Sequence, residues 1–251
     1  MVREAIQGNE FLGPKLPGRE IGIYVYGSYK NKTNLRAHSD IDLYVCWRGN
    51  RFRKDRRSAH EKLKDELEKA LAVYFDDDRV QRRNKAIGLP RTKHRLGADV
   101  LACLEYRRSR GTAGIELWSD AGEHIVSWPW HHLNNGRAKD EATGRRFKPL
   151  VKALKGLRHE LVEEKHWAAL RTPSYLVECL VWNVPANLLR SESRLDNLRK
   201  VLAYLRRGTV EGNGWRRWKE VHCKDLLDHS PRWNDQIVTG FLDAAQRRVF
   251  G

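Results

Sequence analysis

The sequence predicts an α+β protein of two lobes, with a mixed sheet and flanking helices over residues 1–140 and a helical lobe over residues 141–251. Two observations predict this division. Short apolar runs rich in β-branched residues, separated by turns, occupy the first half, whereas apolar residues recur at helical spacing from Thr143 onward. The chain has 251 residues, enough to bury a core in each lobe.

Four strands and one helix are expected in the first lobe. The strands are predicted over residues 21–26, 41–45, 86–89 and 98–104, where apolar runs meet turn residues. The helix is predicted to begin at a capping box over residues 58–61, because a serine there precedes a glutamate by three positions and an apolar helical pattern follows.

The turn after the first predicted strand contains a candidate phosphate site. Gly27 lets the backbone turn tightly against a ligand, and Ser28 adds a hydroxyl. In the second strand, Ile41 points to the core while Asp40 and Asp42 share the other face. Two carboxylates on one face repel each other unless a cation lies between them, and a hard cation such as Mg²⁺ or Mn²⁺ suits oxygen ligands. The spacing therefore indicates metal-dependent nucleotidyl transfer.

A third acid occupies the last predicted strand. Alternation places Asp99 on one face with Leu101 and Cys103, inside a segment that is otherwise apolar. A buried acid is costly unless it is paired or bound to a cation. Asp99 is therefore predicted either as a third metal carboxylate or as the partner of a nearby arginine or lysine.

The second lobe carries candidate phosphate contacts on its first predicted helix. Thr143 can cap this helix, in which Lys148, Lys152 and Lys155 line a stripe beside the apolar one. These lysines are either a solvated basic face or the groups that neutralise a triphosphate. Ser174 lies beside the proline that starts the next helix.

Charge and cysteine usage limit the partners and the compartment. The chain has 48 Lys plus Arg against 32 Asp plus Glu, a net charge of +16, which favours nucleotides, nucleic acid through a basic surface, or an anionic surface, or serves solubility alone. Its four cysteines form no Cys-x-x-Cys pair and are expected to be reduced. Since no apolar run approaches ~20 residues, we expect a cytoplasmic protein with no membrane partner.

A longer set of segments resembles a known family. The Gly-Ser and Asp-x-Asp motifs with a later Asp resemble the polymerase-β-type nucleotidyltransferase superfamily. The ordered segments are more specific and look like bacterial CD-NTases, the cGAS/DncV-like nucleotidyltransferases: GSYKNKTNLRAHSDIDL, NKAIGL, ADVLACLEYRR, WPWHHLNNGRAKDEATGRRFKPLVKALKGLR and PSYLVECLVWNVP.

This resemblance implies a bilobed cGAS/OAS-like fold with a polymerase-β-like catalytic lobe and a helical lobe that completes the nucleotide pocket. It also implies that the protein makes a cyclic or short linear oligonucleotide signal from nucleoside triphosphates such as ATP, with pyrophosphate release. The implied setting is antiphage defence, in which a separate effector protein responds to this second messenger.

The resemblance further implies roles for individual residues. Asp40, Asp42 and Asp99 match the carboxylates that hold two Mg²⁺ ions, and the Gly-Ser turn matches the phosphate-contacting turn. Lys155 and Ser174 fall where the family grips the triphosphate tail.

The segment before the first strand departs from the family pattern. About twenty residues precede Ile21, and they include several glycines and prolines, so we expect the long helix that family members have there to be missing or truncated. This departure leaves room for a linear product. Two other activities stay open: a transferase that adds nucleotides to a nucleic-acid 3′ end or a protein acceptor, and a non-catalytic nucleotide sensor.

Overall fold

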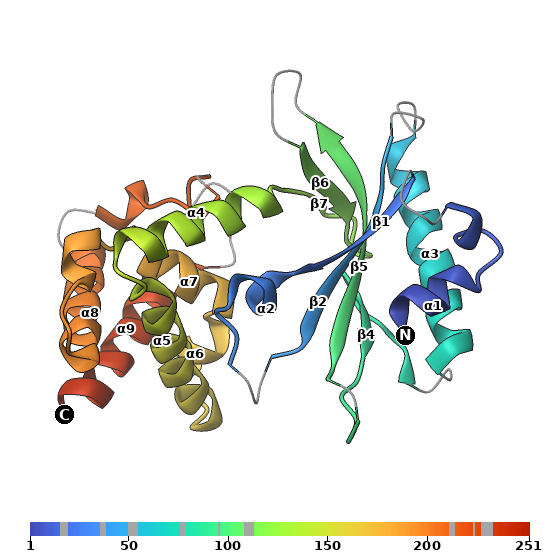
Figure 1. Cartoon of the computed structure of the whole chain (residues 1–251). Coiled ribbons are helices and arrows are strands. Elements are labelled where there is room, and N and C mark those ends of the chain that lie inside the picture. The colour runs from blue at the N-terminus through green and yellow to red at the C-terminus, as the bar shows by residue number, and fades with distance from the viewer. Residues whose placement is uncertain are drawn as a thin grey trace. The chain divides into compact units, whose positions relative to one another are not determined.

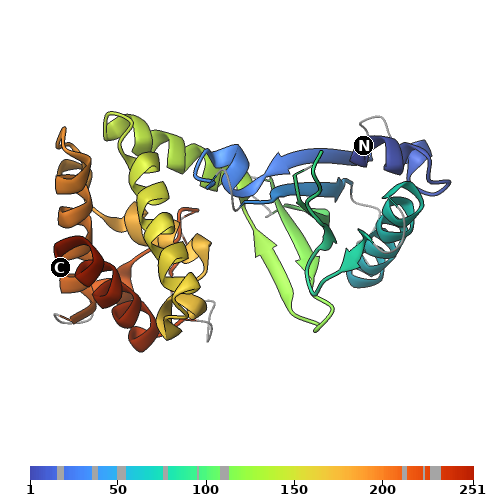
Figure 2. The same cartoon turned by 90° about the horizontal axis from the view of Figure 1, so that it is seen from below.

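A computed structural model describes residues 1–15, 20–35, 39–49, 55–75, 79–94, 96–107, 113–210, 214–222, 224–226 and 233–251 (Figures 1 and 2). The described residues form two units. The first contains the residues up to Trp130 except 32–35, and the second contains 32–35 together with His131 onward. The two units are described separately below.

The first unit is built on a mixed seven-stranded sheet. Its strands are β1 (Ile21–Tyr26), β2 (Ile41–Trp47), β3 (Gln81–Arg82), β4 (Ile87–Leu89), β5 (Ala98–Arg107), β6 (Ala113–Trp118) and β7 (His124–Ser127). The order is β1-β2-β5-β4-β3, with β6 paired to β5 and β7 to β6. Strands β2 and β5 are parallel, and every other pair is antiparallel. The mixed sheet confirms the predicted α+β class, and β3, β6 and β7 are strands that the sequence did not predict.

Helices pack on one face of this sheet. They are α1 (Val2–Gln7) and α3 (Arg56–Phe75), with the 3₁₀ turn η1 (Gly13–Lys15) between them in the chain, whereas α2 (Gly27–Asn31) directly follows β1. The apolar side of α3 joins a core with Val45 of β2 and Val100 of β5, and this core also includes Ile6 of α1. Figure 1 shows α1 and α3 on the same side of the sheet. Alternate residues on those two strands therefore face the opposite side of the sheet.

The predicted start of α3 is wrong by three residues, because the helix is capped at Asp55 and not at Ser58. The helix begins at Arg56, and the carboxylate of Asp55 accepts a hydrogen bond from the backbone N–H of Ser58 over 3.1 Å. Asp55 therefore caps the helix in place of the predicted serine, because an aspartate three residues before that N–H reaches it directly.

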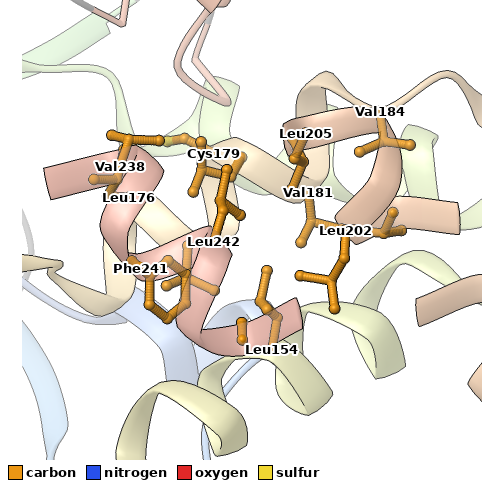
Figure 3. Packing of buried hydrophobic residues seen from close by; sticks show 14 of the residues in the cluster. Leu154, Leu176, Cys179, Val181, Val184, Leu202, Leu205, Val238, Phe241 and Leu242 are labelled. Carbon is orange, nitrogen blue, oxygen red and sulfur yellow. The ribbon is translucent and has the colours of Figure 1, made fainter. Parts of the chain in front are cut away.

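The second unit is helical, as predicted. Its elements are α4 (Pro129–Ala142), which begins in the first unit, α5 (Phe147–Glu163), α6 (Trp167–Arg171), α7 (Ser174–Asn183), η4 (Ala186–Leu189), α8 (Arg194–Val210), η5 (Gly214–Arg217) and α9 (Asp235–Phe250). Figure 3 shows Leu154 of α5 in one core with Leu202 of α8 and Phe241 of α9. This core encloses α7, whose residues 176–181 are all buried.

Two features of the structure relate to the expected reduced cysteines and the expected lack of a membrane partner. Cys46, Cys103 and Cys179 are buried free thiols, and Cys223 lies outside the described residues. Across the described ranges, none of the helices combines the length and the apolar character that a membrane-spanning segment requires.

Candidate active site

The turn between β1 and α2 fixes the first part of the site. Gly27 has φ +65°, a conformation that side chains with a Cβ rarely adopt, and a Cβ there would lie 1.8 Å from Oδ2 of Asp42. The carboxylate of Asp42 therefore packs directly on the Gly27 backbone. Ser28 follows in the first turn of α2, where it is half-buried. Glycine is required at this turn both by backbone conformation and by the space that Asp42 occupies.

The two acids of the Asp-x-Asp motif flank a core residue. Ile41 packs against the α3 side of the sheet, and its backbone N–H donates to the carbonyl of Gly97 over 2.9 Å. Gly97 also makes room for Asp40, since a Cβ there would lie 2.2 Å from its Oδ1. Each of these two carboxylates thus lies against a glycine backbone, Asp40 beside Gly97 and Asp42 beside Gly27.

The third acid lies beside the second on the neighbouring strand. Asp42 of β2 and Asp99 of β5 are register partners in the parallel pair, so both side chains project from the same face. Burial raises the pKa of Asp99, the Arg83 guanidinium acts against this rise, and the charge of Asp40 adds to it. The charges of Asp40 and Asp99 are therefore close enough to interact, and Asp42 lies beside Asp99 as its register partner.

Asp99 forms an ion pair with Arg83 in this structure. Its guanidinium Nη1 lies 2.6 Å from Asp99 Oδ1. The salt bridge that the sequence left open for Asp99 is thus present, whereas the metal role stays a prediction. Within the part of the chain that the structure describes, no group of three or more His, Cys, Asp or Glu side chains lies close enough together to hold a metal ion.

The donor set nevertheless fits a divalent cation. Carboxylate oxygens are the ligands that Mg²⁺ and Mn²⁺ prefer, and the effect of Asp40 on the pKa of Asp99 is the repulsion that a cation relieves. The glycine backbones at positions 27 and 97 also leave the two motif acids room that a side chain would fill. For Asp99 to contribute, its contact with Arg83 has to be exchanged for the cation.

Lys155 lies in a buried network of the second unit. Its Nζ donates to Glu178 Oε2 over 3.0 Å and to the carbonyl of Thr33 over 3.2 Å. Glu178 also accepts from the Thr33 hydroxyl, and His132 Nε2 lies 2.8 Å from its Oε1. Burial acts to raise the pKa of Glu178, but the hydrogen bond with His132 and the charge of Lys155 outweigh it and lower that pKa to about 2. The ammonium of Lys155, which was predicted to contact a triphosphate, is thus hydrogen-bonded to Thr33 and Glu178.

The other two lysines line a pocket in the second unit. The pocket measures about 800 Å³, and the six cationic side chains described along it are Lys32, Arg145, Arg146, Lys148, Lys152 and Arg194. Two acids, Asp140 and Glu192, also line it. Burial lowers the pKa of Lys148, and the charges of Arg137 and Lys32 lower it further, against the effect of Asp140. Crowded cations of this kind favour an anionic ligand.

The remaining predicted residue lies elsewhere. Ser174 is the first residue of α7, where its side chain is exposed. Sequence reasoning missed Arg83, Glu178 and Thr33. The signal for Arg83 was the expectation of a basic partner near Asp99, but its position in the chain gave no reason to choose it over the many other arginines.

Comparisons with known proteins cover nearly the whole chain. The family model of the cGAS/DncV-like nucleotidyltransferase C-terminal helical domain matches residues 134–249, and that of a nucleotidyltransferase domain matches residues 3–86. The chain is similar to the cyclic dipyrimidine nucleotide synthase CdnE of Cecembia lonarensis, with 31% identity over 261 residues that cover 96% of this chain and 87% of the relative.

Two solved structures also resemble it. The CdnE cyclic dinucleotide synthase of Elizabethkingia meningoseptica, solved with GTP and Apcpp, matches with a TM-score of 0.85 and 30% identity, covering 98% of this chain and 89% of that one. The CdnE c-UMP-AMP synthase of Rhodothermus marinus, solved with Apcpp and Upnpp, has a TM-score of 0.78 and 25% identity, covering 98% and 88%.

Proposed function

The chain belongs to the cGAS/DncV-like nucleotidyltransferases, and we propose that it joins nucleoside triphosphates into a cyclic oligonucleotide. In each joining step a ribose hydroxyl attacks an α-phosphorus, a new P–O bond forms, and the bond to the β-phosphate breaks with release of pyrophosphate. The observation that supports this most directly is that Gly27 at the end of β1, Asp42 of β2 and Asp99 of β5 come from three neighbouring strands of the sheet.

The acids and the turn have separate parts in this proposal. Asp40, Asp42 and Asp99 would hold two divalent cations, Mg²⁺ or Mn²⁺, which when bound stabilise charge on the attacking and leaving oxygens. The open backbone at Gly27 would admit the phosphates close to the turn, where the Ser28 hydroxyl can donate a hydrogen bond to them. No side-chain nucleophile is required.

The cationic pocket of the second unit supports polyphosphate binding. Lys148 and Lys152 line it with four further cations. Burial is the main cause that lowers the pKa of Lys148, and a bound anion would offset the further lowering by Arg137 and Lys32. We propose that these two lysines contact a triphosphate or the backbone of an oligonucleotide. The buried network around Lys155 gives that residue an indirect part, which is to hold the unit together.

Relatives of similar identity are named for different products, so the assay must offer every base. The Cecembia lonarensis relative is a dipyrimidine synthase, and a 31% identical relative from Elizabethkingia meningoseptica is a cyclic dipurine nucleotide synthase. The protein would be incubated with all ribo- and deoxyribonucleoside triphosphates and Mg²⁺ or Mn²⁺. Products that survive phosphatase are then identified by mass spectrometry, because a cyclic product has no terminal phosphate.

The carboxylates provide the test of the site. We expect Asp40→Ala/Asp42→Ala to abolish both the product and pyrophosphate release, while Asp196→Ala, which removes an exposed acid in α8, leaves both unchanged. Equal pyrophosphate release by the wild type and the double variant would contradict the proposal.

A second activity is favoured by the charge of the chain. A net charge of +16 and a pocket lined by six described cations suit a polymeric acceptor such as a nucleic-acid 3′ end. Phosphatase-resistant product made from triphosphates alone would argue against this activity, and tight nucleotide binding without pyrophosphate release would argue for a sensor. By its family, we also propose that a cyclic product serves antiphage defence by acting on a separate effector protein.

A further inference from the structure

Asp99 and Arg83 form an ion pair at the surface of the sheet. The guanidinium Nη1 lies 2.6 Å from Oδ1, and the side chains of Arg83 and Asp99 are 44% and 30% exposed. Water therefore reaches both partners, so separating them does not leave a charge in an apolar interior. Such pairs contribute little net free energy and exchange readily for other ions.

The route of Arg83 to this acid depends on a glycine. Gly88 of β4 is the register partner of Asp99 in the antiparallel pair with β5. A Cβ at Gly88 would lie 2.6 Å from the guanidinium carbon of Arg83, and the three nearest atoms all belong to that side chain. The guanidinium thus crosses the backbone of Gly88 to reach Asp99, through space that alanine would fill.

The backbone beneath Arg83 is held in place. Its N–H donates to the carbonyl of Ala86 over 2.8 Å. The buried ammonium of Lys64 donates hydrogen bonds to the carbonyls of Arg83 and Asn84, over 3.0 and 3.2 Å. It also donates to Asp120 Oδ1 over 2.7 Å. Because these bonds fix the backbone, a change of side-chain rotamer is the way in which Arg83 can leave Asp99.

The acids beside this pair carry the charge that a cation would balance. Asp40 acts electrostatically on Asp99, and Asp42 is its register partner on β2. Arg83 is the cationic side chain in contact with Asp99, so it competes with a divalent cation for the same oxygens.

We propose that Arg83 is a latch on the metal site, a positioning residue that occupies Asp99 until a divalent cation displaces it, and that Gly88 provides the path it takes. The proposal rests on the assignment of Asp40, Asp42 and Asp99 as metal ligands in the proposed function. When the cation displaces Arg83 from Asp99, the guanidinium is left free beside the acids. Because the cation must first break this ion pair, its affinity for the site is lower than the three carboxylates alone would give.

Direct measurement of Mn²⁺ binding tests the latch without any turnover. Free Mn²⁺ is followed by electron paramagnetic resonance as the nucleotide-free protein is titrated. We expect Arg83→Gln to tighten Mn²⁺ binding by up to about five-fold, which is what the loss of a competing exposed ion pair worth about 1 kcal/mol converts to.

Gly88→Ala separates the latch from a simple loss of charge. The new methyl group displaces the flexible end of Arg83 and leaves the net charge unchanged, so Mn²⁺ affinity is expected to rise as in Arg83→Gln. Arg107→Gln is the matched control, because it removes an arginine that pairs with Glu105 farther along the same strand as Asp99. Its Mn²⁺ affinity is expected to equal that of the wild type.

The outcomes distinguish failure of the latch from failure of the metal assignment. If Asp40→Ala/Asp42→Ala abolishes Mn²⁺ binding while Arg83→Gln and Gly88→Ala bind as the wild type or more weakly, the latch is overturned and the metal site stands. If the double aspartate variant binds Mn²⁺ as the wild type does, both are overturned. Circular dichroism of each variant confirms that a change in affinity does not reflect loss of the fold.

Discussion

The two units each hold a carboxylate against a cation, and the difference between the two pairs is burial. Arg83 and Asp99 in the sheet are 44% and 30% exposed, whereas Lys155 and Glu178 among the helices are 5% and 4% exposed. A charge left behind by breaking the buried pair has no water to solvate it, while the exposed pair separates into solvent. The buried pair is therefore a fixed part of the fold, and the exposed pair can be exchanged.

The neighbours of the two pairs agree with this difference. Glu178 is also contacted by Thr33 and His132, so the buried carboxylate has a partner on each oxygen. These contacts join residue 33 to α4, α5 and α7 within the second unit. Asp99 instead lies beside Asp40 and Asp42, which are acids, so Arg83 can be replaced there by another cation.

The largest expected effect comes from removing the buried ammonium of Lys155. Lys155→Met is expected to lower the free energy of unfolding by about 3–5 kcal/mol, because it leaves the Glu178 carboxylate buried without its cation. Chemical denaturation measures the change. Lys200→Met, which removes an exposed lysine paired with Asp196 in α8, is the control and should leave the free energy of unfolding nearly unchanged. Equal effects of the two substitutions would show that the burial of Lys155 does not matter.

The pH dependence of stability tests the same pair from the acid side. A pKa lowered from 4.5 to about 2 means that Glu178 contributes about 3 kcal/mol at neutral pH. Because the folded-state pKa is the lower one, this contribution is complete above pH 4.5 and is lost as the pH falls from 4.5 toward 2. The free energies of unfolding of the wild type and Glu178→Gln should therefore differ most at neutral pH and converge below pH 4.5. A difference that is constant from pH 7 to pH 2.5 would contradict the assignment.

The sequence predicted the exposed acids better than the buried network, for a physical reason. Strand alternation is local, so the side of the sheet that Asp99 takes follows from its neighbours Val100 and Leu101 alone. Helical spacing likewise placed Lys155 beside the apolar stripe, but its partners Thr33 and Glu178 are 122 and 23 residues away. Local periodicity carries no information on such pairs.

The elements that the sequence missed show the same limit. Helix α4 begins with Pro129 and contains two histidines, two asparagines and one glycine, so its apolar residues form no clear stripe. Strands β6 and β7 are short. β6 pairs with the second half of β5, which extends three residues beyond its predicted end, and β7 pairs with β6. In each case tertiary contacts, which the local pattern does not encode, decide the structure.

The smallest expected effect is on the stability of the exposed pair, and it sharpens the comparison most. Arg83→Gln should lower the free energy of unfolding by at most about 1 kcal/mol, since both side chains are solvated when apart. Chemical denaturation without divalent ions measures this change, and a repeat in Mn²⁺ supplies the contrast. If Arg83 competes with the cation, Mn²⁺ stabilises Arg83→Gln more than it stabilises the wild type, because ligand stabilisation grows as the dissociation constant falls. A loss as large as that of Lys155→Met would instead place Arg83 among the fixed parts of the fold, and exchange at Asp99 would then be too costly for a latch.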